Sequence, residues 1–148
     1  MIVGFGDYRR ELELIAPPGT LFTGPLEHRH LVHLLPLADV TVVPSIFPEA
    51  FGMVAAEAAA AGSLPLVARH SGLAEIAEGL EAAYPVEHRH LVSFATGDAA
   101  DLAAKLDELL TLSSETRAEL AAAARSTAVQ LWSWTSIAAR LLEPIGGG

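Results

Sequence analysis

Short apolar runs alternate with helix-like segments along this chain. The runs at residues 2–5, 21–23, 40–43 and 64–68 predict strands, and turns rich in glycine or proline separate them from segments with helical periodicity. The continuous apolar character of residues 40–43 is typical of a parallel strand that is buried on both faces. A strand that leads through a glycine turn into a helix is the repeating unit of open α/β sheets. The pattern therefore predicts an α/β fold.

Helices are predicted between these strands. Two cover residues 8–16 and 27–37, and a third opens at Phe51-Gly52 and ends at Gly62, which fits a C-cap glycine. The third helix is built almost entirely from small residues, so it can pack closely on a sheet. The strand at 64–68 then leads through Ser71-Gly72 into a further helix.

The last third of the chain is predicted to be helical. Thr96-Gly97-Asp98 caps a helix with leucines on one face, namely Leu102, Leu106, Leu109 and Leu110. A second helix covers 115–130, and Trp132-Ser133-Trp134 introduces a final one that reaches residue 142. Gly146-Gly147-Gly148 is expected to form a flexible end. The two tryptophans are interpreted as core anchors, or as cover for a missing partner surface, rather than as sugar platforms.

Residues 44–62, PSIFPEAFGMVAAEAAAAG, are the stretch that most resembles a ligand site. Glu49 lies just before the helix and Glu57 lies inside it, with seven residues between them. The N–H groups of Phe51, Gly52 and Met53 are expected to be free at the start of the helix, where they can bind a phosphate or a carboxylate. Gly52 has no Cβ, which lets a ligand approach the backbone.

The two carboxylates leave their chemistry open. A pair of this kind suits general acid and base catalysis, and it equally suits accepting hydrogen bonds from the hydroxyls of a sugar or ribose. The alternative is that Glu49 is a loop charge and Glu57 lies on a solvated face.

Composition narrows the class of protein. A length of 148 residues predicts one domain, and no apolar run is long enough to span a membrane. The start carries no signal-like segment, so a cytoplasmic location is expected. The chain has no cysteine, which excludes disulfides and thiolate metal sites, and its net charge of −9 argues against nucleic-acid binding through a basic surface.

One hexapeptide, EHRHLV, occurs at residues 27–32 and again at 87–92. The two H-R-H triplets suggest a metal site, because imidazole is a common metal ligand. On a helix, however, His28 and His30 face about 200° apart. The two copies are also expected to occupy different elements. We therefore predict no metal here and no structural repeat.

Four stretches occur in the order found in one enzyme family. The stretches 44–62 and 63–75, SLPLVARHSGLAE, are similar to the E-x7-E signature and following loop of retaining glycosyltransferases with the GT-B fold, in particular glycosyltransferase family 4. Residues 22–45, FTGPLEHRHLVHLLPLADVTVVPS, resemble the segment before it, and Gly4-Phe5-Gly6 resembles the family's G-x-G turn. The likeness covers residues 2 to about 80.

This resemblance implies a Rossmann-like parallel sheet with helices on both faces, forming the C-terminal half of a GT-B fold, followed by C-terminal helices. It implies that the whole of 1–148 is one nucleotide-sugar-binding domain, with Glu49 bonded to hydroxyls of the donor sugar and Glu57 bonded to the ribose. The donor-binding residues that it implies are Gly4, Gly6, Leu26, Glu27, Phe51, Gly52, Met53, Glu57 and Gly72. The substrate would be a nucleotide-diphosphate sugar, with no metal and no other cofactor.

The resemblance is incomplete in two places. In the loop at 69–75, Ser71 replaces the first glycine of the family's G-G-x-P-E pattern and Ala74 replaces its proline, while Arg69 and His70 are candidates for local positive charge. By this resemblance, the family's first strand and helix of this domain, with their arginine and lysine, and its N-terminal acceptor domain are expected to lie outside this chain.

The chain alone is therefore expected to be inactive. Two alternatives stay open, a noncatalytic α/β binding module and part of a GT-B sugar-nucleotide epimerase.

Overall fold

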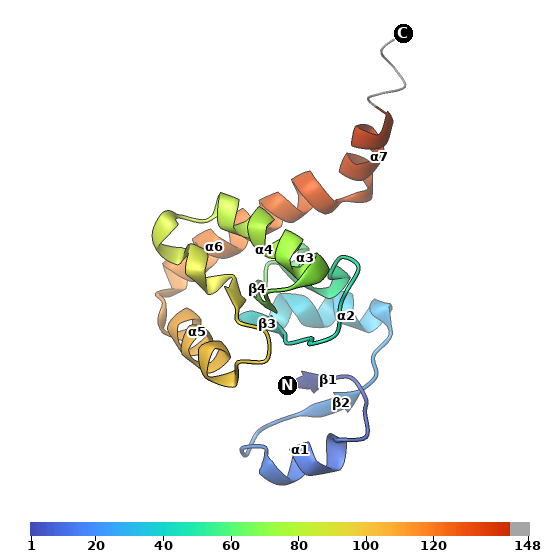
Figure 1. The fold of residues 1–148 in the computed structure, drawn as a ribbon, viewed down its shortest axis with the longest axis vertical. Coiled ribbons are helices and arrows are strands. Elements are labelled where there is room, and N and C mark those ends of the chain that lie inside the picture. Colours follow the sequence, from blue (N-terminus) through green and yellow to red (C-terminus); the bar gives the residue numbers. More distant parts are fainter. Residues whose placement is uncertain (143–148) are drawn as a thin grey trace. The chain divides into compact units, whose positions relative to one another are not determined.

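The computed structural model describes residues 1–142 of the chain. These residues form two compact units, Met1–Leu34 and the part of the chain from Leu35 onward (Figure 1). The organisation of the whole chain as one domain stays a prediction.

The first unit contains a small parallel sheet and two short helices. Strand β1 (Ile2–Val3) pairs with β2 (Phe22–Gly24), with Ile2 opposite Phe22 and Val3 opposite Gly24. Helix α1 (Arg9–Ile15) connects the two strands, and α2 (His28–Leu34) follows β2. All four elements lie where the sequence pattern predicts them, although β2 is displaced by one residue and the other three are shorter than their predicted ranges.

The second unit is built on a three-stranded parallel sheet in the order β3-β4-β5. Strand β3 (Val40–Val43) pairs along its length with β4 (Leu64–Ala68), and β4 also pairs with β5 (Ser93–Phe94). All five residues of β4 are buried, as a central parallel strand requires. The α/β class with parallel strands and flanking helices, consistent with the C-terminal half of a GT-B fold, is therefore confirmed.

Four helices pack around this sheet. They are α3 (Met53–Ala61), α4 (Ser71–Ala83), α5 (Ala99–Thr111) and α6 (Ser114–Thr127) (Figure 1). The core that they form with the sheet is aliphatic, and its largest fully buried side chains include Leu64, Leu66, Leu73, Ile76, Leu80, Leu91, Leu109 and Leu120. The predicted leucine face of α5 is correct for Leu109, which is buried, and for Leu102 and Leu106, which pack against the core. Leu110 is half exposed because it lies one residue round the helix.

Two departures from the predicted helices have local causes. The helix predicted over 27–37 ends at Leu34 and continues as a 3-10 turn η1 (Leu35–Leu37), because Pro36 has no N–H to donate within an α-helix. The helix predicted over 115–130 becomes a π-helical segment η3 (Ala128–Trp132) before the last helix α7 (Trp134–Leu142). The predicted flexible end at 146–148 lies outside the described residues.

The two copies of EHRHLV adopt different conformations. The first contributes to α2, whereas the second lies in the 3-10 helix η2 (Val86–Leu91). Identical local sequence therefore takes two backbone forms, as the prediction of different elements required. In the second copy, His90 Nε2 lies 3.0 Å from a carboxylate oxygen of Glu108 in α5. This contact comes from a neighbouring helix and not from the hexapeptide itself.

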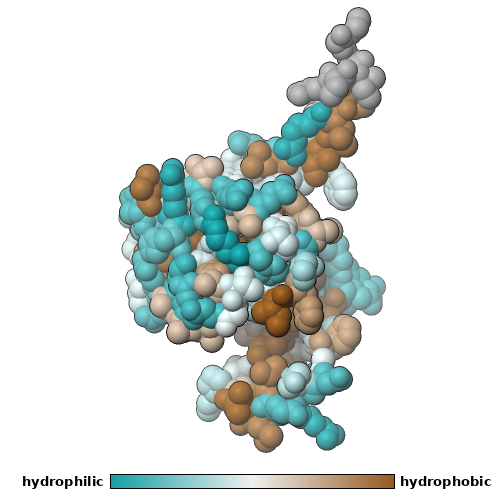
Figure 2. Space-filling model, viewed as in Figure 1, coloured by the Kyte–Doolittle hydropathy of each residue, from teal (hydrophilic) through white to brown (hydrophobic). Residues whose placement is uncertain are grey.

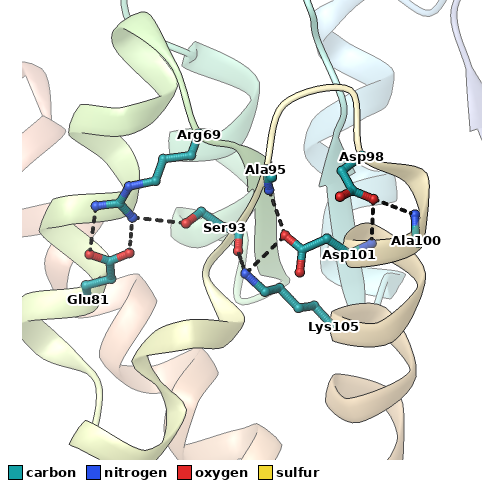
Figure 3. A network of polar contacts seen from close by, with 8 residues as sticks. All are labelled: Arg69, Glu81, Ser93, Ala95, Asp98, Ala100, Asp101 and Lys105. Carbon is teal, nitrogen blue, oxygen red and sulfur yellow. Dashed lines mark hydrogen bonds and ion pairs between the residues drawn. The ribbon is translucent and has the colours of Figure 1, made fainter.

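A polar network holds the carboxyl ends of β4 and β5 to the helices beside them (Figure 3). Arg69, which follows β4, pairs with Glu81 of α4 and donates to the Ser93 hydroxyl of β5 at 3.0 Å. Lys105 of α5 donates to the Ser93 carbonyl and lies 3.5 Å from the Asp101 carboxylate. The network therefore joins two strands and two helices through side chains that are only partly exposed.

The contacts of Asp101 in this network lower its pKa. Its carboxylate accepts the Ala95 N–H at 2.7 Å, and this bond, with a smaller contribution from Lys105, lowers the pKa of Asp101. A lowered pKa stabilises the folded state above the pKa of the unfolded chain, and that contribution is lost as pH falls through the folded value.

We expect Asp101→Asn to lower the free energy of unfolding at pH 7, and we expect this effect to shrink as the pH falls below about 4, the ordinary pKa of an aspartate, and through the lower pKa of the folded protein. Urea denaturation at pH 7, 4 and 3 measures the difference. Asp107→Asn, an exposed carboxylate on the same helix, is the control. A difference between Asp101→Asn and wild type that is the same at all three pH values contradicts the assignment.

Candidate functional site

The loop between β3 and α3 carries Glu49 and ends at Gly52. Gly52 has φ +94° and is the N-cap residue of α3, so its backbone has the left-handed conformation that favours glycine. A Cβ at this position would lie 2.6 Å from Cδ2 of Leu73 in α4. Gly52 is thus fixed by both conformation and space, and it sets the direction in which α3 leaves the loop.

The start of α4 packs directly on this loop. The Gly72 N–H donates to the Glu49 carbonyl at 2.9 Å. A Cβ at Gly72 would lie 2.4 Å from both N and Cα of Phe51 and 2.6 Å from the Ala50 carbonyl carbon, so the two backbones are in contact. Gly72 was predicted to bind the donor, but its N–H is bonded to the Glu49 carbonyl. In the structure, its lack of a side chain lets α4 approach the Glu49 loop.

The loop before α4 also holds the Glu49 segment through side chains. Ser71 Oγ accepts the Glu49 N–H at 3.0 Å, and His70 Nε2 donates to the Ser45 carbonyl at 2.6 Å. The two candidates for local positive charge differ in their surroundings. Arg69 is paired with Glu81 in the polar network of β4 and β5, while His70 faces the loop that carries Glu49.

Glu57 lies on the exposed side of α3, where it lines an apolar groove of about 440 Å³. The groove runs between α3 and residues 128–137, and Glu57 and Ser133 are its polar residues. Its apolar lining consists of Phe51, Met53, Ala56, Ala60, Ala128, Val129, Trp132, Trp134 and Ile137. A carboxylate at the edge of aromatic and aliphatic surface can accept hydrogen bonds from hydroxyls while a flat apolar group lies beside it.

A second depression, of about 280 Å³, lies at the opposite ends of the strands. Its lining includes Asp39 and Leu64, where β3 and β4 begin. Arg117 also contributes, but its guanidinium donates to main-chain carbonyls, those of Leu110 and Leu112, at 2.8 Å each. Ligands in open α/β sheets bind at the carboxyl ends of strands, so the groove beside Glu57 and the Glu49 loop is the better candidate.

The two tryptophans have different environments. Trp132 packs on the core, with its ring edge-on to Phe51 at 6.2 Å between centroids, and a Cβ on Gly79 would lie 2.8 Å from its Cζ2. Trp134 is 80% exposed. The core-anchor interpretation fits Trp132 and is wrong for Trp134, which lines the groove, and the alternative that it covers a missing partner surface stays a prediction. The π-helical turn at 128–132 comes just before this change from buried to exposed ring.

The surface around the groove is otherwise mixed. Helix α7 contains no buried residue, and hydrophobic side chains are visible along it in Figure 2. Leu141 and Leu142 are more than 60% exposed. The face of the second unit that is seen in the same view carries mostly hydrophilic residues.

The remaining predicted site residues belong to the first unit. Gly4 has φ +134° and donates its N–H to the Gly24 carbonyl at 3.0 Å, while the Gly6 carbonyl accepts from Arg9. Leu26 is partly buried, and Glu27 pairs with Arg29 at 2.9 Å. Gly4, Gly6, Leu26 and Glu27 are thus located within their own unit, and their part in a common site with Glu49 stays a prediction.

Two classes of feature are absent from the described residues. Residues 1–142 contain no group of three or more His, Cys, Asp or Glu side chains that could hold a metal ion. No helix in that range combines the length and the hydropathy needed to cross a membrane.

The chain matches a known protein family over most of its length. The family model "Glycosyl transferases group 1" matches residues 1–127. The chain belongs to this family. Two curated relatives, both named glycogen synthase and both from Mycobacterium tuberculosis (strains CDC 1551 / Oshkosh and ATCC 25618 / H37Rv), are 44% identical to it over 91 residues. Those residues are 62% of this chain, which spans about 20% of the length of the relatives.

The hydrogen bonds that hold the Glu49 loop in position could not be predicted from the sequence. Ser71 and His70 lie more than twenty positions from Glu49 and Ser45, and no short motif links them. The available signal was the serine in place of a glycine at the start of α4. The contact between Trp132 and Phe51 has no signal in local sequence, because the residues come from different elements.

Gly72 gives the first test of this arrangement. We expect Gly72→Ala to lower the free energy of unfolding by about 1–3 kcal/mol, because the new methyl group meets backbone atoms that cannot rotate away. Urea denaturation measures the change. Gly6→Ala is the control, since a methyl group at Gly6 would have nothing within 4 Å, and its expected effect is under about 0.5 kcal/mol. Equal stability of the two variants would show that the loop yields easily.

The tryptophans give the second test. Trp132→Ala is expected to cost about 2–4 kcal/mol, below the full range for a completely buried ring, whereas Trp134→Ala is expected to change stability by less than about 0.5 kcal/mol. Urea denaturation followed by circular dichroism measures both. Because the chain has two tryptophans, each variant leaves a single emitter. Trp134→Ala should show blue-shifted emission from Trp132, and red-shifted emission would contradict its packing on the core.

Proposed function

We propose that this chain is the donor-binding part of a retaining glycosyltransferase that uses a nucleotide-diphosphate sugar. The observation that carries the proposal is the junction of β3 and α3, where Glu49 lies in a loop held against α4 and Glu57 lies further along α3 beside an apolar groove. Membership of the group 1 family and the likeness to glycogen synthase support the same reaction class.

Each residue of the junction has a proposed task. Glu49 accepts hydrogen bonds from hydroxyls of the donor sugar, and Glu57 accepts them from the ribose. The N–H groups of Phe51 and Gly52 give no bond to a backbone carbonyl within the described residues, so they are proposed donors to the diphosphate. The chain has a net charge of −9, so its surface as a whole does not favour a phosphate ligand. Neutral N–H donors at the start of a helix can bind a phosphate without a basic surface.

The proposed reaction exchanges one bond at the anomeric carbon for another. The bond from that carbon to the diphosphate oxygen breaks, and the nucleoside diphosphate leaves with the electron pair. The acceptor hydroxyl oxygen bonds to the same carbon on the same face, and its proton goes to the oxygen of the departing diphosphate. Stabilising the charge of the departing diphosphate is the main electrostatic task, and no metal is proposed for it.

The acceptor is proposed to bind to a second α/β domain. This chain spans about a fifth of the length of its glycogen synthase relatives, so most of such a protein has no counterpart in it. Under this proposal the donor is held here and transfer requires the other domain.

Titration of the chain with UDP, GDP and ADP tests the proposal. We expect one of the three to bind, seen by calorimetry or by NMR shifts at Phe51, Gly52 and Glu57. We expect Glu57→Gln to weaken that binding about tenfold or more, because the ribose hydroxyls lose a charged acceptor. Glu119→Gln, which removes an exposed carboxylate on α6, is the matched control.

The outcomes separate the proposed function from a noncatalytic module. Weakened binding in Glu57→Gln alone, with folding unchanged, supports the donor site. A folded chain that binds none of the three diphosphates contradicts it. Equal weakening by Glu57→Gln and Glu119→Gln would indicate a general effect of charge rather than contact with the ribose.

A further inference from the structure

We propose that Ser71 and His70 are positioning residues, which hold the backbone of the Glu49 loop in one conformation and so set where the Glu49 carboxylate points. This inference rests on the proposed function, since it gives these residues a task in the same site. It is carried by three hydrogen bonds between the start of α4 and the loop, at the Ser45 carbonyl, the Glu49 N–H and the Glu49 carbonyl.

The three bonds fix both ends of the segment that carries the carboxylate. His70 Nε2 reaches the Ser45 carbonyl at 2.6 Å, at the beginning of the loop. Ser71 Oγ reaches the Glu49 N–H at 3.0 Å, and the Gly72 N–H reaches the Glu49 carbonyl at 2.9 Å. Both peptide groups of Glu49 are therefore bonded to consecutive residues of α4.

The directions of these bonds form one consistent chain. A carbonyl oxygen can only accept, so His70 Nε2 carries a proton. In the neutral ring Nδ1 is then an acceptor, and it lies 2.9 Å from Ser71 Oγ, whose hydroxyl donates to it. The Ser71 oxygen keeps its lone pairs for the Glu49 N–H. His70 thus orients the hydroxyl that orients Glu49.

The backbone of Ser71 points to the same role. Ser71 has φ +43° and is the non-glycine residue with positive φ among the described residues. A serine in this region of conformation costs free energy relative to glycine. At an ordinary turn glycine would be the more stable choice. The hydroxyl bonds to Glu49 and His70 are the contacts that glycine could not make.

The substitution Ser71→Gly therefore separates a positioning role from a structural one. It relieves the conformational cost and removes the hydroxyl, so a purely structural residue would show unchanged or higher stability with unchanged binding. The positioning role predicts that stability is kept while amide hydrogen exchange at Glu49 speeds up. It also predicts that the diphosphate found in the titration binds about three- to tenfold more weakly.

Two further variants sharpen the result. His70→Gln keeps a donor for the Ser45 carbonyl but loses the Nδ1 acceptor, so it should speed up exchange at Glu49 less than Ser71→Gly does. Ser113→Ala is the matched control, because Ser113 Oγ also accepts a backbone N–H at 3.0 Å, that of Thr116 at the start of α6. It should leave both exchange at Glu49 and binding unchanged. A nitrogen NMR spectrum of His70 should show the form protonated at Nε2.

The outcomes are distinct from those for the proposed function. If wild type binds none of UDP, GDP and ADP, the proposed function fails, and exchange at Glu49 still decides whether Ser71 holds the loop. If wild type binds and Ser71→Gly binds equally well, the positioning role is overturned while the donor site stands. Exchange at Glu49 that is the same in Ser71→Gly and wild type overturns the positioning role in either case.

Discussion

The arrangement of the second unit depends on a direct backbone contact between the loop after β3 and the start of α4. Gly72 lies so close to Phe51 that no side chain fits between them, and Gly52 faces Leu73 in the same way. Two adjacent crossover connections of a parallel sheet are thereby brought into contact at the carboxyl ends of their strands. This is the edge at which open α/β sheets place ligands, so the contact that closes the core also forms the base of the candidate site.

The polar network around Arg69 joins the sheet to its helices without contacting this loop. Arg69 follows β4 by one residue, yet its charge is matched by Glu81 and its second contact is to β5. Consecutive side chains after β4 thus divide between two tasks. Arg69 joins strands and helices, while His70 and Ser71 reach the loop that carries Glu49.

How much of this could be predicted depends on whether the cause is local. The strands at 40–43 and 64–68 and the glycine caps at Gly52 and Gly62 follow from apolar runs and backbone conformation, and they were found. The two-residue strand β5 begins with a polar residue and is too short to show a pattern, so it was missed. The hexapeptide EHRHLV shows the limit most clearly, because its two copies form an α-helix and a 3-10 helix. Where local sequence is identical, only the surroundings can decide.

The candidate site divides along the same line. Glu49, Glu57 and Gly52 were identified from their spacing around a helix start, which is a local property. The orientation of Glu49 comes from residues in the next loop, and a serine at φ +43° marks the place where local preference is overruled. A glycine there would satisfy the backbone and leave the Glu49 N–H without its partner. The choice of serine is explained if the position of the loop matters more than the ease of the turn, and a loop whose only role was to connect β3 to α3 would place no such demand on its neighbour.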